Sequence, residues 1–445
     1  MSTIDTSRCL HELIRDQVRR TPDAPALVDV RQTLTYAELD RRSDALAARL
    51  RADGVGPDQL VGVLMERRVD YVVACLAALK AGGAFLVLEL AYPDALLADV
   101  LADARPRVVV TMAAHADRVD PSVPRLVLDD QGPAPTRPVA ADDGGDPTPA
   151  SLAFVSYSSG TTGRPKGIAN PHRAAVRSYA WRFGISDLAP GDRVACNVFF
   201  VWEMLRPLVR GAAVVVIDDD VIYDPVALVA FLREQRVTEV LMTPSLLETV
   251  LGRVGRDLTA DLPELRVLWL NGEVVTRVLA RNALRALPAT RVLNVYSASE
   301  THEIAAGDLR EQVGVDTTFC PVGPPMDPDH TYVLDDHGRP VPHGVEGELH
   351  VGGGCLASHY LNLPDATAAA FVPDPFAAGA DARMYRTGDR ARVLDGGVLE
   401  ITGRVGSMVK IRGYSVEPGA VQAAINRSLG VSASVVVAHG DEGDD

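Results

Sequence analysis

The stretch YSSGTTGRPKG, residues 157–167, brings glycines, hydroxyl side chains and one lysine together in a short segment. Glycines let backbone N–H groups turn inward, hydroxyls add donors, and an ammonium group adds positive charge, a combination that suits phosphate oxygens. It is not a Walker-type loop, because the lysine follows a proline and no serine or threonine comes directly after it. A flexible surface turn is the alternative, but Lys166 is one of three lysines in an arginine-rich chain. The segment therefore predicts a phosphate-binding loop.

The elements around this loop alternate between apolar strand-like runs and amphipathic helical runs, which predicts βαβ units and parallel sheets. A Pro-, Gly- and Asp-rich linker at 131–150 separates two such series. From about residue 330, short strands with Gly and Pro turns predict a small antiparallel β-barrel. The expected strands of the two sheets are 59–65, 84–89, 107–112 and 125–130, and then 212–218, 237–244, 265–273 and 291–300.

The composition excludes several classes of function. A net charge of −15 argues against binding to nucleic acid or to an anionic membrane surface, since both favour clustered Lys and Arg. The five cysteines are widely spaced and show no metal-ligand pattern. The sequence contains no signal-peptide-like apolar segment and no run of roughly 20 apolar residues. A cytoplasmic protein that does not span a membrane is expected.

The segment LAFVSYSSGTTGRPKGI resembles the phosphate loop of the adenylate-forming (ANL) superfamily, in particular the adenylation domains of non-ribosomal peptide synthetases. The resemblance extends along most of the chain, because other motifs follow the family's order. They are LTYAELDRRSDALAARL, LKAGGAFLVLELAYP, NVYSASE, GELHVGGGCLASHYLNLPDATAAAF, YRTGDRARVLDGG and GRVGSMVKIRGYSVEPGAV.

The resemblance implies a fold and a domain division. The fold class is α/β, with two stacked parallel-type α/β subdomains and a small β-barrel in a large N-terminal lobe at 1–405. The beginning of a small α+β C-terminal lobe at 406–445 would follow. The family's aspartate hinge position holds Gly406 here, and Ile401 stands where relatives often have an aromatic residue near the ribose.

The small lobe of the family carries a further lysine beyond Lys410, and this chain has none. Truncation, interruption by an inserted domain, and a lobe supplied in trans are the three explanations. The expectation is that this chain adenylates poorly unless the rest of the small lobe is supplied, because a preorganised cation is missing.

The resemblance also implies a site for ATP and Mg²⁺. Asn294 and Tyr296 would contact adenine, Ser299 the α-phosphate, and Glu300 the Mg²⁺ ion. Asp389 would bind the ribose hydroxyls beside Arg404. The purely structural alternatives are an aspartate in a turn for Asp389 and a glutamate at the start of a helix for Glu300. Lys166, Glu300 and Lys410 are the expected catalytic residues. The β and γ phosphates would lie on the loop residues Ser158, Ser159, Gly160, Thr161, Thr162, Gly163 and Lys166.

The implied reaction joins a small carboxylic acid to AMP and releases pyrophosphate. Its catalysis rests on positioning and on charge stabilisation, because the substrate carboxylate is itself the nucleophile. The acyl group would pass to the phosphopantetheine thiol of a carrier protein, and an MbtH-like helper protein is a further candidate partner. An acyl-CoA ligase and a catalytically impaired nucleotide-binding scaffold remain alternatives.

The acid itself is expected to be unusual. Relatives that accept α-amino acids have an aspartate where this chain has Val198, so a buried ammonium would lack its counter-charge. An aryl, keto or hydroxy acid avoids the problem, and so does a β-amino acid whose amine pairs with Glu303, with Asn271 nearby. Core packing is the alternative role for the aromatic residues, and the two tryptophans imply a small substrate. The inferred pocket wall is Val198, Phe199, Trp202, Leu241, Trp269, Asn271, Val295, Glu303 and Ile304.

Overall fold

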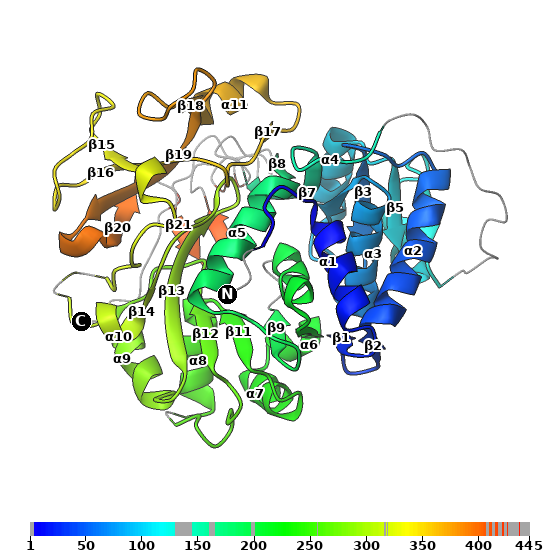
Figure 1. Cartoon of the computed structure of the whole chain (residues 1–445), viewed down its shortest axis with the longest axis horizontal. Coiled ribbons are helices and arrows are strands. Elements are labelled where there is room, and N and C mark those ends of the chain that lie inside the picture. The colour runs from blue at the N-terminus through cyan, green and yellow to red at the C-terminus, as the bar shows by residue number, and fades with distance from the viewer. Residues whose placement is uncertain are drawn as a thin grey trace.

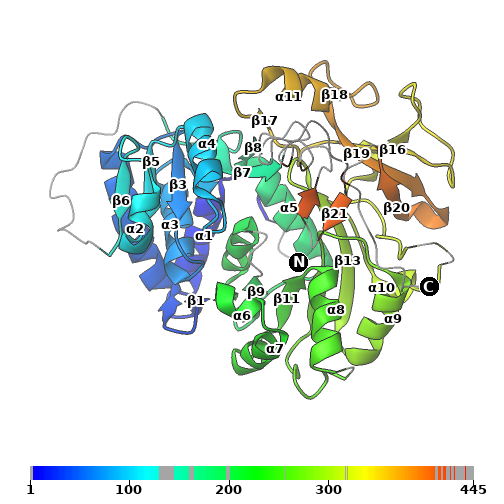
Figure 2. The ribbon, with the colours of Figure 1, turned by 180° about the vertical axis from the view of Figure 1, so that it is seen from behind.

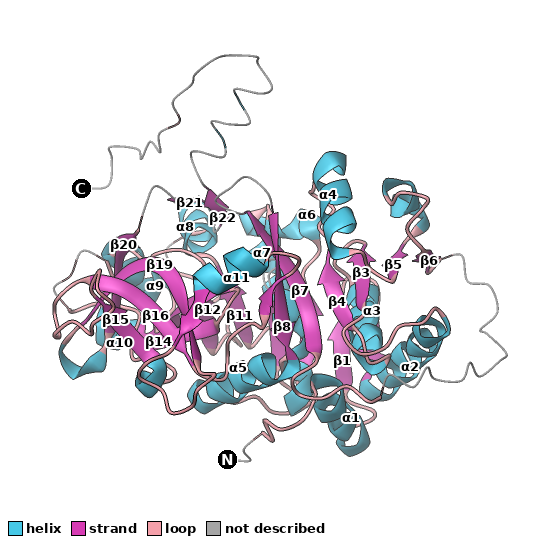
Figure 3. Cartoon of the chain, turned by 90° about the horizontal axis from the view of Figure 1, so that it is seen from above, coloured by secondary structure: helices cyan, strands magenta, loops and turns pink. Residues whose placement is uncertain are grey.

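The computed structural model describes residues 4–129, 145–159, 165–196, 201–255, 257–315, 317 and 319–405, with two short strands and single positions beyond them. The strands form a central layer with helices on both sides. Figure 3 shows α4 and α8 on one side of this layer and α1 and α5 on the other. This arrangement confirms the predicted α/β class, because parallel strands joined by helical crossovers need cover on both faces.

The first sheet has the strand order β17-β8-β7-β4-β3-β5-β6. Its strands β3 to β6 pair in parallel as predicted. Strands β7 and β8 follow the linker at 131–150 that was expected to separate the two series, but both belong to this first sheet. Strand β7 pairs in parallel with β4, and β8 and β17 are antiparallel additions at that edge. The strands are β3 (Leu60–Leu64), β4 (Ala84–Val87), β5 (Val108–Thr111), β6 (Arg125–Val127), β7 (Leu152–Ser159), β8 (Pro165–Pro171) and β17 (His359–Tyr360). The accompanying helices are α2 (Tyr36–Ala52), α3 (Val69–Lys80), α4 (Asp94–Ala104) and the 3-10 helix η1 (Ala113–Arg118).

The second sheet has the order β14-β13-β12-β11-β9-β10-β1-β2. Its predicted strands pair in parallel, and β1 and β2 from the N-terminal region extend the sheet beyond β10. The strands are β1 (Pro25–Val28), β2 (Thr33–Thr35), β9 (Arg193–Cys196), β10 (Ala213–Val216), β11 (Glu239–Met242), β12 (Val267–Leu270), β13 (Arg291–Ala298) and β14 (His302–Asp308). The helices are α1 (Leu10–Arg20), α5 (His172–Ile185), α6 (Asp219–Ile222), α7 (Pro225–Glu234), α8 (Pro244–Arg253), α9 (Arg277–Ala286) and α10 (Leu309–Gln312), with the 3-10 helices η2 (Val201–Leu205) and η3 (Pro207–Arg210).

The third sheet is antiparallel and lies above β13 of the second sheet in Figures 1 and 2. Its order is β15-β16-β19-β18, and the long strand β19 also pairs with β20. The pairings of the described residues form an open sheet and do not close into the expected barrel. The elements are β15 (Thr331–Leu334), β16 (Gly347–Gly352), β18 (Phe371–Pro373), β19 (Arg383–Val393), β20 (Leu399–Arg404), α11 (Pro364–Ala370), η4 (Pro328–His330) and η5 (Asp395–Gly397).

One hydrophobic core joins the first two subdomains. Helix α3 is buried along its whole length, as its nearly continuous apolar sequence requires. Helix α1 contacts both α3 and α5, so side chains from both sheets share this core. Within the described residues, no helix combines the length and apolarity needed to cross a membrane.

Candidate nucleotide and acid site

Residues predicted to bind adenine and ribose meet at the junction of the second and third sheets. Asp389 on β19 pairs in register with Arg404 on β20, and Arg404 Nε lies 3.2 Å from Asp389 Oδ1. The phenolic O–H of Tyr296, on β13, donates to Asp389 Oδ2. Burial, reinforced by the Asp389 charge, raises the pKa of Tyr296. The phenol is therefore a hydrogen-bond donor at neutral pH and holds the carboxylate in one orientation.

Glu300, the predicted Mg²⁺ ligand, lies in a buried turn between β13 and β14. The phenolic O–H of Tyr360 donates to Glu300 Oε1 at 2.8 Å. Burial raises the pKa of Glu300, while the hydrogen bond from Tyr360 and the charge of Lys166 oppose that shift. Glu300 supplies the hard oxygen donor that Mg²⁺ prefers, so this site fits the expected ion.

Tyr360 links Glu300 to the phosphate-loop lysine. The ammonium nitrogen of Lys166 lies 5.3 Å from the centroid of the Tyr360 ring, within the range of a cation–π contact. Tyr360 lies on β17, which pairs with β8, the strand that carries Lys166. Sequence reasoning missed Tyr360, although it belongs to the quoted motif GELHVGGGCLASHYLNLP.

The strands on either side of the predicted phosphate loop form a β-hairpin. Strands β7 and β8 pair Ser158 with Lys166 and Ser159 with Pro165, so the two ends of the loop meet. Tyr157 at the start of the motif donates to Asp103 Oδ2 at 2.6 Å and ties the hairpin to α4. Ser158 and Lys166 are both partly exposed, as a phosphate contact requires. The short two-stranded sheet of β21 (Val409–Ile411) and β22 (Tyr414–Val416) lies against β7.

Two other predicted nucleotide residues have local partners. Asn294 is buried, and its amide donates to the carbonyl oxygens of Cys320 and Pro321 at 3.3 and 3.1 Å. Ser299 is partly exposed, and its carbonyl oxygen accepts a bond of 3.3 Å from Asn170. Their contacts with a nucleotide remain predictions.

The described residues of the predicted acid pocket divide into two groups. Leu241, Trp269 and Val295 belong to one hydrophobic cluster on the second sheet, next to α5. Asn271 lies at the end of β12 and accepts a hydrogen bond of 3.1 Å from Ser297. Ile304 instead packs in the core beneath the third sheet. Ile304 is therefore separated from that apolar cluster.

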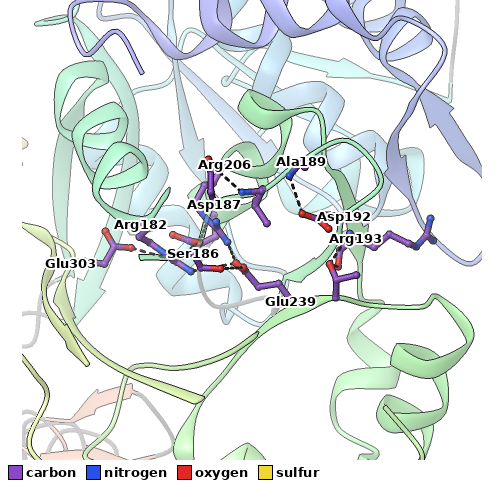
Figure 4. Close-up of polar contacts among 12 residues, drawn as sticks. Arg182, Ser186, Asp187, Ala189, Asp192, Arg193, Arg206, Glu239 and Glu303 are labelled. Atoms are coloured by element: carbon purple, nitrogen blue, oxygen red, sulfur yellow. Dashed lines mark hydrogen bonds and ion pairs between the residues drawn. The ribbon is translucent and has the colours of Figure 1, made fainter. Parts of the chain in front are cut away.

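Glu303, the only charged residue predicted for the wall, already has partners. Ser178 and Arg182 on α5 both donate to its carboxylate. The bond from Arg182 Nη1 is 3.3 Å long (Figure 4). Sequence reasoning missed Arg182. The sequence offers only an arginine within the helical run HRAAVRSYAWRFGI. An arginine in a helix ordinarily faces solvent, so this one did not point to a buried ion pair.

The remaining predicted site positions lie outside the described residues. They are Gly160, Thr161, Thr162, Gly163, Val198 and Phe199, together with the side chains of Ser159, Trp202 and Lys410.

The fold and the meeting of Tyr296, Asp389 and Arg404 define a protein of the adenylation-domain class. The family model for AMP-binding enzymes matches residues 14–361, and the chain belongs to this family. Its relatives include peptide synthetases, and its structural neighbours include non-ribosomal peptide synthetase proteins with adenylation domains.

Among curated proteins, the chain is 58% identical over 448 aligned positions to glycine betaine reductase ATRR of Emericella nidulans, covering 99% of this chain and 35% of that protein. It is 36% identical to malpibaldin synthetase of Mortierella alpina, covering 100% of this chain and 8% of that protein. The chain thus spans about a third of the first relative and a small part of the second.

Solved structures agree with this assignment. The AMPPNP-bound form of the synthetase FmoA3 superimposes with a TM-score of 0.81 at 31% identity, covering 97% of this chain and 46% of that one. Holo-PA1221, a non-ribosomal peptide synthetase protein with adenylation and PCP domains, gives a TM-score of 0.83 at 25% identity, covering 95% of this chain and 73% of that one.

Proposed function

We propose that this chain activates a small carboxylic acid with a quaternary ammonium group, such as glycine betaine, as its acyl adenylate. The observation that carries the proposal is the pairing of Glu303 with Arg182 and Ser178, which leaves no unpaired carboxylate among the described wall residues. Val198 removes the other expected counter-charge. The 58% identical relative is named for a reaction of glycine betaine.

A quaternary ammonium group suits such a wall for a chemical reason. It has no N–H to donate, so it loses no hydrogen bond when it faces apolar or aromatic side chains. Trp and Phe faces attract such cations through their π electrons, and Phe199 and Trp202 are the sequence candidates for that contact. A primary ammonium would leave N–H donors unpaired, which costs on the order of 1–3 kcal/mol for a buried group and more when it is charged.

The reaction needs the acid carboxylate held in line with the α-phosphorus of ATP. A carboxylate oxygen forms the new O–P bond, the bond from the α-phosphorus to its bridging oxygen breaks, and pyrophosphate leaves with that electron pair. Asp389 accepts from the ribose hydroxyls, Tyr296 packs on adenine, and Lys166 offsets phosphate charge. Glu300 would hold Mg²⁺, whose positive charge stabilises the negative charge that develops on the phosphates.

The second half-reaction passes the acyl group to a phosphopantetheine thiol, which releases AMP. The proposed partner is a carrier protein, since structural neighbours include adenylation and PCP domains in one chain. Coenzyme A presents the same thiol, so the acyl-CoA ligase remains the second candidate. Supplying holo carrier protein and coenzyme A in parallel and measuring AMP release separates the two.

The test of the first half-reaction is exchange of labelled pyrophosphate into ATP. The panel is glycine betaine, dimethylglycine, sarcosine and glycine, with β-alanine, an α-keto acid and an aryl acid. Activity should rise steeply with each added N-methyl group. A preference for glycine or another common α-amino acid would refute the proposal. A β-alanine preference lost in Glu303→Gln would instead support the displaced-amine alternative. No exchange with any acid, even when the rest of the small lobe is supplied, would support the scaffold.

A further inference from the structure

A cluster of five buried ionic side chains includes Glu303 of the predicted acid wall and adjoins the wall residue Trp269. Figure 4 labels Arg182, Arg206, Glu239 and Glu303 of this cluster. Two arginines and three glutamates come from α5, η2 and the residue after it, β11 and β14, and each is at most 4% exposed. They are Arg182, Glu203, Arg206, Glu239 and Glu303. Buried charges on this scale are retained only when they are paired, so the positions of these side chains are tightly coupled.

Arg182 is the member of the cluster that stacks on the wall residue Trp269. Its guanidinium carbon lies 4.1 Å from the centroid of the Trp269 ring, and Trp269 is completely buried. Nη1 of Arg182 lies 2.6 Å from Glu203 and 3.3 Å from Glu303, which holds the guanidinium in place. Trp181 and Ile185 of the same helix pack against the wall cluster that contains Trp269.

The second arginine has a different position. Arg206 pairs with Glu239 and Glu203, and its guanidinium lies 5.7 Å from the Phe183 ring centroid. Among the described residues, a cation–π contact on Trp269 is found for Arg182 and not for Arg206. The two arginines therefore share one charge network, but only Arg182 covers the wall tryptophan.

We propose that Arg182 is a specificity-determining residue that closes the far end of the acid pocket. This inference rests on the proposed function. On this proposal the guanidinium, stacked on Trp269, fills the space that a longer acid would need, and its ion pair with Glu303 leaves that carboxylate occupied and not free to pair with an amine. Short acids whose cationic group carries no N–H are then preferred.

The arginine does not make the pocket repel a cationic acid. Three carboxylates face two guanidiniums in the cluster, which leaves one negative charge in excess. Cys196 and His302 adjoin the cluster without adding charge at neutral pH, because burial raises the pKa of Cys196 to about 12 and lowers that of His302 to about 4.

The test compares two matched double variants in pyrophosphate exchange. Arg182→Met with Glu303→Gln removes one charge of each sign next to Trp269. Arg206→Met with Glu239→Gln removes the same charges from the other side of the network. The acids are glycine betaine and its homologues with one and two more methylene groups between the carboxylate and the trimethylammonium.

The first variant should raise kcat/KM for the longest acid relative to glycine betaine by about 10-fold or more, the scale on which pockets discriminate added methylenes. KM for ATP should stay within about 2-fold of wild type in both variants, and the control should keep the wild-type ratio. An unchanged ratio in the first variant, or an equal change in the control, would overturn the proposal.

Arg182→Lys keeps the charge but shortens the side chain and loses the flat stacking surface. Arg182→Lys should also raise kcat/KM for the longest acid relative to glycine betaine. If the double variant does not fold, this single variant tests the role of Arg182. If wild type exchanges none of these acids, the proposed function fails. The comparison is then made with homologues of the acid that wild type does accept, and an unchanged length preference there overturns the role of Arg182.

Discussion

Tyr296 and Asp389 lie on different sheets, and a hydrogen bond from the tyrosine to the aspartate joins them at the predicted ribose site. The aspartate is also held by Arg404 and by its own backbone N–H, which donates to Thr387 at 3.0 Å. The carboxylate is thus oriented before any nucleotide binds, and such preorganisation lowers the entropic cost of binding.

Replacing Asp389 should weaken nucleotide binding. Asp389→Ala removes the charged acceptor for the ribose hydroxyls, which is worth roughly 1.5–3 kcal/mol, or about a 10- to 100-fold increase in Kd. Calorimetric titration with ATP measures this change in Kd. The control is Arg390→Ala, because Arg390 lies on the same strand but is more exposed. An Asp389→Ala protein that melts normally and binds ATP with wild-type affinity would contradict the assignment.

Tyr360→Phe should impair the use of Mg²⁺ while it preserves the aromatic ring beneath Lys166. The variant loses only the O–H that donates to Glu300, so Glu300 is less well oriented and its pKa rises further. The acidic limb of the exchange rate should therefore move to higher pH, and more Mg²⁺ should be needed for half-maximal rate. Tyr360→Leu, which removes the ring as well, should in addition raise KM for ATP. Identical pH and Mg²⁺ profiles for Tyr360→Phe and wild type would rule out this role.

Stability should fall as the solution becomes acidic, because buried histidines are held neutral. Burial lowers the pKa of His11 to about 4 and that of His172 to about 3, and the backbone N–H of Leu10 donates to His172 Nδ1. The unfolded chain binds their protons near pH 6.5, so the stabilisation is complete above that pH and is lost as pH falls toward 4.

In the middle of this pH window, each of these histidines lowers the free energy of unfolding by about 1.4 kcal/mol for every pH unit of acidification. Thermal melting between pH 7.5 and 5 checks the prediction. His172→Gln, which can still accept from Leu10, should have a flatter dependence of Tm on pH than wild type. A steeper or equal dependence would show that His172 is not the source.

Lys80 should matter for stability and not for catalysis. Its side chain is buried and its ammonium bonds to Asp40 and, at 2.8 Å, to Asp44. Lys80→Met leaves Asp40 without this partner, while Asp44 keeps a longer contact of 4.0 Å with Arg15. A loss of about 2 kcal/mol in the free energy of unfolding is expected, below the roughly 3–5 kcal/mol of fully buried pairs because Asp44 is largely exposed. Denaturant unfolding measures the loss. A fall in exchange rate without a change in stability would contradict it, whereas that pattern is expected for Lys166→Ala.

Several features followed from the sequence because they depend on local pattern. The alternation of apolar strands and amphipathic helices predicted both parallel sheets, since a short crossover leaves a strand few places to pair. The glycine- and hydroxyl-rich loop before Lys166 indicated phosphate binding from its own residue types. Motif order then predicted the family, which the AMP-binding family model confirmed.

Other features depended on contacts between distant parts of the chain. Strand β1 joins the second sheet beside β10, although nearly the whole first sheet lies between them in sequence. The sequence led us to treat Glu303 as a free charge, but its partner Arg182 lies on a helix 121 residues earlier. Pairing of a buried charge is set by which elements pack together, and no local pattern carries that information. The sequence by itself therefore determined the class of protein and predicted a phosphate loop, whereas only the tertiary structure showed that Glu303 of the predicted acid wall is already paired.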